Sequence, residues 1–345
     1  MTEDSSHTSK PLHPNHIRPN LHIGRILAFL SILTFFLTIL TFLLESNLSA
    51  IFNIMPHWVY FLAFMIPGLM GWIWFHSKWG LTSFALWLLL FFCYSDFFKQ
   101  LPFSPKPINE QSFPFQFKKL RIVTLAADDP LQIDTEAVKA LAPDIILMEV
   151  ENNPIAITQT AFFIMGKNMK IKQYNNHAII TRYGNLEGSS HGDSPCITTE
   201  WQPEFDGRCI RLVNVITTPR PNQNSFISLG NTHKIFDLQS KHKKEMQRVY
   251  QHLANLNMDQ GPCPVILGGN FNTPAHSLIF KPIKEIGQDT YEVAGKGYGA
   301  TSPASFPLFR FHRIFTSLDF TPLQTYTVDV SGTTERCVVS DVIYQ

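Results

Sequence analysis

One short segment of the sequence combines residue types that are suited to binding a ligand. Residues 264–274 read Pro-Val-Ile-Leu-Gly-Gly-Asn-Phe-Asn-Thr-Pro, so an apolar run reaches two glycines and then two amide side chains, Asn270 and Asn272. The apolar run predicts a buried strand that breaks at the glycines. Polar side chains at the carboxyl end of such a strand often line ligand sites in α/β proteins.

Three further segments place polar residues in a similar way. Pro143-Asp-Ile-Ile-Leu-Met-Glu149 ends on a carboxylate, Arg310-Phe-His-Arg-Ile-Phe315 contains His312, and Val339-Ser-Asp-Val342 contains Asp341. Together with the first segment, they resemble in order and spacing the signatures of the endonuclease/exonuclease/phosphatase superfamily, the DNase I-like Mg²⁺-dependent phosphoesterases. The resemblance covers essentially all of residues 118–345.

This resemblance implies both a fold and a chemistry. The fold is a four-layer α/β/β/α sandwich. The chemistry needs a metal held by carboxylate and amide oxygens, an Asp that activates water, and a His that balances charge in the transition state. On the matching positions, the resemblance implies that Glu149 is a metal carboxylate and that Asn272 and Asp341 are retained site residues.

Five other positions of the family pattern carry different residues here. Ala126 stands where the first strand should end in Asn, and Ile216, in Leu212-Val-Asn-Val-Ile216, stands where a His is expected. Asn270 and His312 each replace an Asp, and Val342 replaces the closing His. Since the loss of one acid or base commonly lowers a rate by about 10²–10⁴-fold, we expect almost no turnover.

The sequence therefore predicts a membrane-anchored pseudoenzyme that binds a protein or a phosphate-containing ligand and needs no cofactor. The vestigial site consists of Glu149, Asn270, Asn272, His312 and Asp341. The alternative is an active phosphodiesterase or phosphatase with Mg²⁺ or Mn²⁺ in a rearranged site, acting on lipid headgroups.

Each of these residues also has an ordinary structural interpretation. Asp128 and Asp129 could be displaced metal ligands, but Asp-Asp-Pro is typical of a turn. Asn270 and Asn272 could bond their own turn, and Glu149 could be a solvated or hydrogen-bonded carboxylate. His312 could be a ring packed among Phe309, Phe311 and Phe315.

The elements that must position these residues alternate between strand and helix. A strand over 120–125, a helix from Asp134 or Thr135 to about Leu141, and a strand over 144–148 predict a β-α-β start. An amphipathic helix is expected over 239–255. Further strands are expected over 177–181, 196–201, 208–217, 264–267, 309–316, 323–330 and 337–340, with a hairpin turn at 204–207.

The chain before Lys118 has a different character. Only 6 of the 28 Lys and Arg residues and 5 of the 27 Asp and Glu residues precede it. Uncharged or nearly uncharged apolar stretches predict three transmembrane helices, at about 26–44, 58–75 and 81–98, after a disordered tail over 1–24. Residues 99–117 form a proline-rich linker, and 118–345 form the phosphoesterase-like domain.

Charge and cysteine content limit where this domain acts. The charges on the two sides of the expected spans predict a cytoplasmic N-terminus, because one side carries Lys10, Arg18, Arg25 and Lys78 while the loop over 45–57 has no Lys or Arg. Three spans then place the domain on the other side of the membrane, in a periplasmic or extracellular location. Equal numbers of acidic and basic residues in 118–345 make a nucleic-acid partner unlikely. The even number of cysteines in this part, which are Cys196, Cys209, Cys263 and Cys337, permits disulfides without requiring them.

Overall fold

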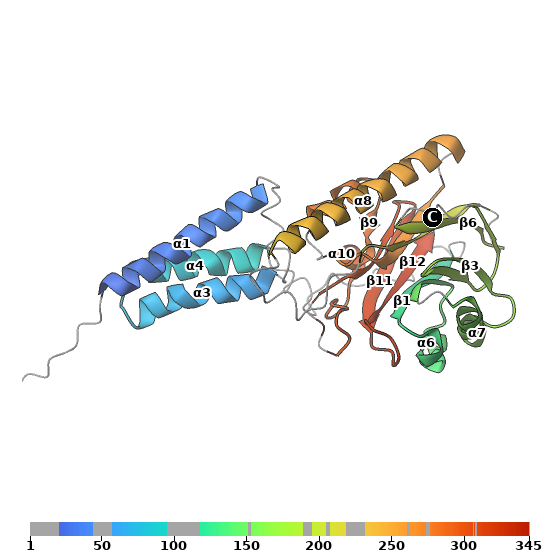
Figure 1. Cartoon of the computed structure of the whole chain (residues 1–345), viewed down its shortest axis with the longest axis horizontal. Coiled ribbons are helices and arrows are strands. Elements are labelled where there is room, and N and C mark those ends of the chain that lie inside the picture. Colours follow the sequence, from blue (N-terminus) through green and yellow to red (C-terminus); the bar gives the residue numbers. More distant parts are fainter. Residues whose placement is uncertain are drawn as a thin grey trace, which may run out of the picture. The chain divides into compact units, whose positions relative to one another are not determined.

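The computed structural model describes residues 21–43, 57–94, 118–150, 153–188, 195–204, 208–218, 232–260, 263–273, 277–305, 307 and 309–344. These residues belong to two compact units, one helical and one built on β-sheets (Figure 1). The expected tail over 1–24 falls mostly outside the described residues. So do the linker over 99–117, the end of the third expected span, and the turn at 205–207.

The helical unit contains three apolar helices, α1 (Leu21–Leu43), α3 (His57–Ile73) and α4 (Lys78–Tyr94). Their contacts include a small polar network: the Ser31 hydroxyl donates to the Phe64 carbonyl at 3.0 Å, and the hydroxyl of Ser83 lies 2.6 Å from that of Ser31. The Trp87 indole donates to the Ser31 carbonyl at 3.1 Å. Hydrogen bonding of this kind satisfies hydroxyls inside an otherwise apolar bundle.

The expectation of three membrane spans is met only in part. Helices occupy all three places, but only α1, through the window His22–Ile39, is long and apolar enough to cross a membrane. The other two helices have 17 residues each. The second helix ends at Ile73 because the chain turns before Lys78, where His76 takes a left-handed φ of 49° that no helix can contain.

The second unit is built on two six-stranded sheets, in the orders β11-β12-β1-β2-β4-β3 and β5-β6-β7-β8-β10-β9. The strands of the first sheet are β1 (Lys119–Ala127), β2 (Ile145–Val150), β3 (Lys170–Tyr174), β4 (His177–Thr181), β11 (Phe320–Val328) and β12 (Cys337–Tyr344). Those of the second are β5 (Asn185–Glu187), β6 (Cys196–Gln202), β7 (Ile210–Ile216), β8 (Val265–Asn270), β9 (Gln288–Asp289) and β10 (His312–Thr316).

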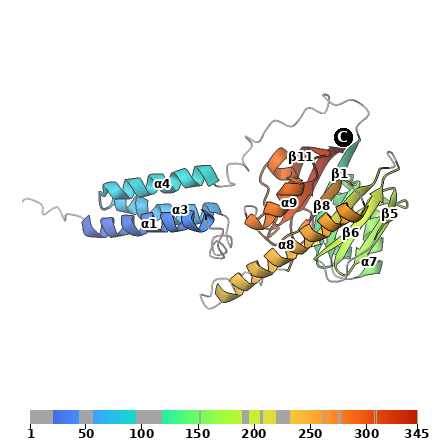
Figure 2. The same cartoon turned by 90° about the horizontal axis from the view of Figure 1, so that it is seen from above.

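Three apolar clusters show how the layers stack. The cluster between the sheets includes Ile122, Leu147 and Ile266, which are side chains from both sheets. The helices α6 (Thr135–Ala140) and α7 (Pro154–Met165) cover the outer face of the first sheet. Helices α8 (Thr232–Gln260) and α9 (Lys281–Ile286) cover the outer face of the second, and Figure 2 shows α8 in front of the sheet that contains β6 and β8. The predicted four-layer α/β/β/α sandwich is confirmed.

Local sequence explains most element ends. Asp134 caps α6 by accepting a hydrogen bond from the Ala137 amide at 3.0 Å, as the expected start of that helix requires. Short elements complete the unit: η2 (Pro130–Gln132), η5 (Leu278–Phe280) and α10 (Thr290–Ala294).

Gly268 and Gly269, in residues 264–274, do not break their strand, contrary to expectation. β8 continues through Gly268 and Gly269 to Asn270. A Cβ on Gly268 would lie 2.6 Å from the Leu147 side chain of the other sheet, and one on Gly269 would lie 2.2 Å from the Val215 carbonyl. Gly269 also has a φ of 128°. Gly268 is therefore needed because the two sheets approach closely at this point, and Gly269 because of its positive φ and its closeness to the neighbouring strand β7.

Candidate functional site

The strand registers bring the expected motif positions to one end of the space between the sheets. In the first sheet, Ala126 of β1 pairs with Glu149 of β2. In the second, Asn270 of β8 pairs with Ile216 of β7 on one side and with His312 of β10 on the other. All five alternate in phase with residues of the inner cluster, so their side chains point between the sheets.

Asn270 and Glu149 meet across the two sheets. The Asn270 amide Nδ2 donates a hydrogen bond of 2.8 Å to Oε2 of Glu149. Burial raises the pKa of the Glu149 carboxyl and the charge of Asp128 adds to this, while the bond from Asn270 acts in the opposite direction. Glu149 is thus a hydrogen-bonded carboxyl rather than a solvated one, as one of its structural interpretations proposed.

Glu335, which the sequence did not indicate, completes the cluster. Its side chain is 12% exposed, and its Oε2 lies 3.4 Å from Nε2 of His312. The side chains of Ser302, Thr301 and Asn270 hydrogen-bond to it. Burial, together with the neighbouring charge of Glu149, raises the pKa of Glu335 to about 7, although those hydrogen bonds act in the opposite direction. Two carboxyl groups, bridged by one amide, therefore share this end of the domain.

His312 faces this cluster, while Phe315 faces the outer core. Residues 312 and 314 of β10 point inward, whereas Phe315 belongs to the cluster under α8 and α9. The His312 ring is 1% exposed, and burial lowers its pKa to about 3, so the imidazole is neutral. Within the described part of the chain neither ring nitrogen of His312 makes a hydrogen bond, and Oε2 of Glu335 lies 3.4 Å from Nε2.

A second histidine that the sequence analysis missed lies in the same region. His177 of β4 pairs with Glu149 of β2 and is 6% exposed. Burial lowers the pKa of its imidazole to about 4, although a bond with the Asn214 backbone acts in the opposite direction. Its place at the start of a strand, after a turn, is the signal that could have drawn attention to it.

Asn272 behaves as a turn residue. Its backbone N–H donates to Oδ1 of Asn270 at 3.1 Å, and its own amide donates to the Thr217 carbonyl at 3.0 Å. Its φ of 46° is one that Asn adopts more readily than most residues. These contacts support the structural interpretation of Asn272, and they hold the end of β8 in place.

A pocket of about 350 Å³ opens beside Glu149. Its lining consists of Ala126, Ala127, Asp128, Asp129, Glu149, Val150, Asn176 and Thr334. Asp129 already caps η2 by accepting from the Leu131 amide at 3.0 Å, which supports its interpretation as a turn residue. Asp128 is exposed and lies close enough to influence Glu149. The pocket is acidic, and none of its lining residues is basic.

Asp341 and Val342 do not join this site. Asp341 lies within β12 opposite Arg121, and Val342 lies opposite Leu120. Asp341 binds the Arg121 guanidinium at 2.6 and 2.9 Å and accepts from Gln324 at 2.6 Å. Arg121 is five residues before Ala126 on β1, or about 17 Å along a strand. The segment Val339-Ser-Asp-Val342, which was expected to close the site, therefore lies away from it, inside strand β12. A strand that alternates polar and apolar residues can resemble the closing motif in sequence.

A magnesium site of the kind that the resemblance implies does not fit these residues. Mg²⁺ needs several oxygen ligands in an octahedron, and it is repelled by hydrogen-bond donors. At Glu149 the carboxylate oxygen Oε2 already accepts a hydrogen bond from Nδ2 of Asn270. Among the described residues, the acids and histidines around Glu149 do not form a group of three with ligand atoms within 4.8 Å of one another.

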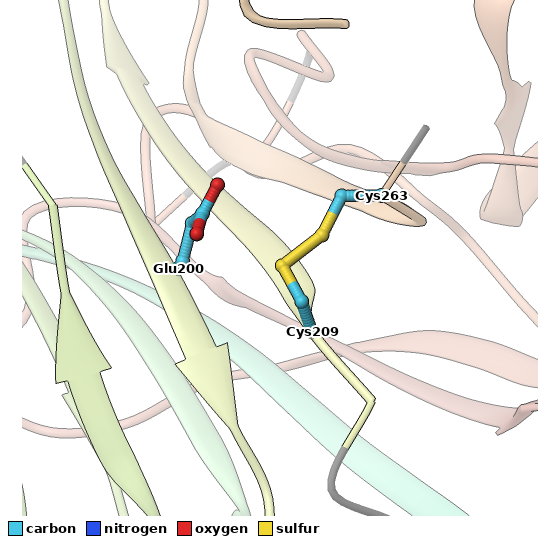
Figure 3. Close-up of side chains that lie close together, drawn as sticks. All are labelled: Glu200, Cys209 and Cys263. Carbon is cyan, nitrogen blue, oxygen red and sulfur yellow. A yellow bond between two sulfur atoms is a disulfide. The ribbon is translucent and has the colours of Figure 1, made fainter. Parts of the chain in front are cut away.

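Such a group occurs elsewhere, at Glu200, Cys209 and Cys263. Figure 3 shows that the two cysteines are joined in a disulfide, so their sulfur atoms are not metal ligands. Glu200 pairs instead with the buried Arg211 at 3.1 Å. The disulfide ties the chain before β7 to the chain before β8, while Cys196 and Cys337 are buried outside this bond.

Comparison with known proteins shows the fold. No protein-family model matches the sequence, and no curated protein matches it. The endonuclease/exonuclease/phosphatase of Bacteroides vulgatus superposes with a TM-score of 0.51 at 10% identity, over 66% of this chain and 100% of that one.

Two Bacteroides thetaiotaomicron structures give a TM-score of 0.49 at 14% identity. One is an endonuclease/exonuclease/phosphatase family protein, which matches 67% of this chain and 100% of its own. The other is the mannosyl-6-phosphatase Bt3783, which matches 65% of this chain and 100% of its own. The superposition on the Bacteroides vulgatus structure shows that the chain has the fold of the endonuclease/exonuclease/phosphatase proteins.

Proposed function

We propose that this chain is a membrane-attached domain with a phosphoesterase fold that binds a ligand without turning it over. The observation that carries the proposal is the bond from Asn270 Nδ2 to Glu149. A neutral amide thus already bonds one of the two oxygens of the carboxylate that a metal would need. The two neighbouring positions, Ala126 and Ile216, offer neither a ligand atom nor a proton donor.

A hydrolysis assay on the full chain tests this proposal. We expect no release of nitrophenol from bis(p-nitrophenyl) phosphate by the protein in detergent, with Mg²⁺ or with Mn²⁺, above the rate in buffer alone. Glu149→Ala should give the same trace as the natural chain. Metal-dependent turnover that disappears in Glu149→Ala, but persists in a variant of the exposed Glu187, would contradict the proposal.

The alternative, an active hydrolase, is favoured by one observation. Glu335, with a pKa near neutrality, lies 3.4 Å from the neutral imidazole of His312 and shares Asn270 with Glu149. A carboxyl group with such a pKa could exchange a proton at neutral pH. If this pair is catalytic, Glu335→Gln and His312→Ala should each abolish the turnover that the first assay detects.

The pocket's charge bears on what it would bind. Its lining includes three carboxylates and no basic group. Such a pocket favours a ligand that presents a cationic or hydroxyl group over the bare phosphate that the sequence suggested. A thermal shift of the full chain by choline but not by inorganic phosphate, lost in Asp128→Asn, would support this ligand class. Stabilisation by phosphate alone would contradict it.

Membrane attachment is proposed through α1, with α3 and α4 packed beside it. The window His22–Ile39 has a mean hydropathy of 1.8. Location of the sheet domain outside the cytoplasm is supported by the Cys209–Cys263 disulfide, because such bonds persist in oxidising compartments. We expect the chain to stay in the membranes after carbonate extraction. We also expect a protease added to intact cells to reach the domain.

A further inference from the structure

Helix α7 exposes an apolar face that the fold does not use. Ile155 is 73% exposed, Phe162 43% and Phe163 60%. Leu131 of η2, which packs near α7, is 57% exposed. The same side of α7 also carries the exposed, uncharged Thr158 and Gln159. Large exposed apolar side chains that gather on one side of a helix usually mark a binding face.

The opposite face of α7 accounts for its structural role. Ile157, Ala161 and Ile164 are buried against the outer face of the first sheet. Apart from this face, a helix on a protein surface normally carries charged residues. The helix reads Pro-Ile-Ala-Ile-Thr-Gln-Thr-Ala-Phe-Phe-Ile-Met and has no charge at all. Packing inside the domain therefore explains one side of α7 and leaves the other unexplained.

Basic residues follow this apolar face immediately. Lys167 and Lys170 are exposed, just beyond the end of α7 at Met165. Neither forms an ion pair with another residue in the part of the chain that the structure describes. Phenylalanines beside lysines are typical of helices that lie in a lipid interface, because the rings enter the acyl boundary while the ammonium groups remain among headgroups.

We propose that the exposed face of α7, formed by Ile155, Phe162 and Phe163 together with Leu131, docks on the surface of a lipid bilayer. The bilayer is the one in which α1 is proposed to sit, so this inference rests on the proposed membrane attachment. Residues 95–117 join the two units, and such a stretch reaches roughly 80 Å when extended. Tethering at this distance gives the domain a high effective concentration at the membrane surface.

Docking in this way would also place the acidic pocket at the membrane surface. Leu131 directly follows Asp129 and Pro130 in η2, and Asp129 lines the pocket. The bond from the Leu131 amide to Asp129 couples the apolar patch to the pocket wall. A ligand would then reach the pocket from the headgroup layer.

A fluorescence experiment on the full chain in vesicles tests the docking. In a Cys93→Ala background, Ile155→Cys and Phe163→Cys are each labelled with the polarity-sensitive dye NBD. The vesicles contain phosphatidylcholine and phosphatidylglycerol, with or without a spin-labelled lipid as quencher. Cys196 and Cys337 are buried and should stay unlabelled. We expect blue-shifted emission that the spin-labelled lipid quenches.

Leu318→Cys is the matched control. Leu318 is an exposed leucine, 77% accessible, in the turn between β10 and β11, and its label should report water and remain unquenched. The docking proposal is overturned if labels at 155 and 163 behave like the control. It is also overturned if their emission is blue-shifted but insensitive to the lipid quencher, because a protein would then cover the face.

Charge reversal provides a second, independent variant. The double variant Lys167→Glu and Lys170→Glu should reduce quenching at position 163. The reduction should be larger in vesicles with phosphatidylglycerol than in vesicles of phosphatidylcholine alone, because only the anionic phosphatidylglycerol attracts the lysines. Equal quenching in both lipids would remove the role of the lysines. Extraction by carbonate distinguishes the two proposals: a chain that leaves the vesicles lacks membrane attachment, whereas a retained but unquenched chain lacks docking.

Discussion

Asn270 donates a hydrogen bond of 2.8 Å to Glu149, and in doing so joins the two β-sheets at one end of their interface. In the same place the amide of Asn270 also bonds Glu335. One neutral side chain thus separates two carboxyl groups that would otherwise repel one another. The stability of this end of the domain depends on position 270 remaining uncharged.

Asn270→Asp should therefore destabilise the fold and create a need for metal. A third carboxylate in place of the bridging amide removes two hydrogen bonds and adds repulsion, so we expect a loss of about 1–3 kcal/mol in the free energy of unfolding. Mn²⁺ should recover part of it by binding the new carboxylate. Thermal unfolding with and without Mn²⁺ measures both effects. Asn270→Ala is the control, because it should be destabilised without recovery.

Glu335 should make the domain less stable as the pH rises. Its pKa of about 7 in the folded chain exceeds the ordinary 4.5, so the folded state keeps a proton that the unfolded state releases in this range. The stabilisation from this proton is complete below pH 4.5, declines between pH 4.5 and pH 7, and is absent above about pH 7. The free energy of unfolding changes by about 3 kcal/mol over this range. Burial lowers the pKa values of His177 and His312, so these histidines add stability as the pH rises and oppose the contribution of Glu335. Chemical unfolding at several pH values should therefore show the Glu335 contribution as the difference between the natural chain and Glu335→Gln.

Glu335→Gln should remove the loss of stability that Glu335 causes as the pH rises, because glutamine cannot ionise. At about pH 8 this variant should unfold at a higher denaturant concentration than the natural chain. Glu149, whose pKa is also raised, leaves a smaller slope in the same direction. An unchanged slope in Glu335→Gln would mean that Glu335 does not carry the raised pKa.

The Arg121–Asp341 pair should matter for stability and not for ligand binding. Asp341 is fully buried, and burial works to raise its pKa, but the bonds from Arg121 and Gln324 lower it overall. Arg121→Ala leaves this carboxylate without its main partner, so we expect a loss of about 3–5 kcal/mol. Arg121→Met combined with Asp341→Leu should recover most of it. Denaturant unfolding of the three variants tests this.

The disulfide between Cys209 and Cys263 should be detectable by labelling and by stability. Maleimide should modify these two cysteines only after reduction. Replacing both by Ser opens a closed stretch with a sequence separation of 54, which should cost about 4 kcal/mol. The controls in the labelling are Cys196→Ser and Cys337→Ser, which change the two buried cysteines outside the disulfide and leave that bond intact. Modification of Cys209 without reduction would show that the bond is absent.

Much of the fold follows from local sequence. Apolar strands and capped helices alternate along the chain, and the starts of α6 and β4 were predicted at the positions where the structure has them. Asn270 was found because it follows an apolar strand, whereas Glu149 and His312 were found from short motifs that resemble those of the family. Such signals are contained within a few residues, so the sequence alone reveals them.

The membership of the site depended on pairings between distant segments. Asp341 was assigned to it from a local pattern, but the register of β12 on β1 places Asp341 against Arg121. Glu335 was missed because it lies in an irregular loop and becomes a site residue only through contacts with His312 and Asn270. By itself the sequence determined the strands and the side chains at their ends. Only the tertiary structure decided which of those side chains share a buried environment, because burial and the neighbouring charges that set a pKa arise from the packing of both sheets.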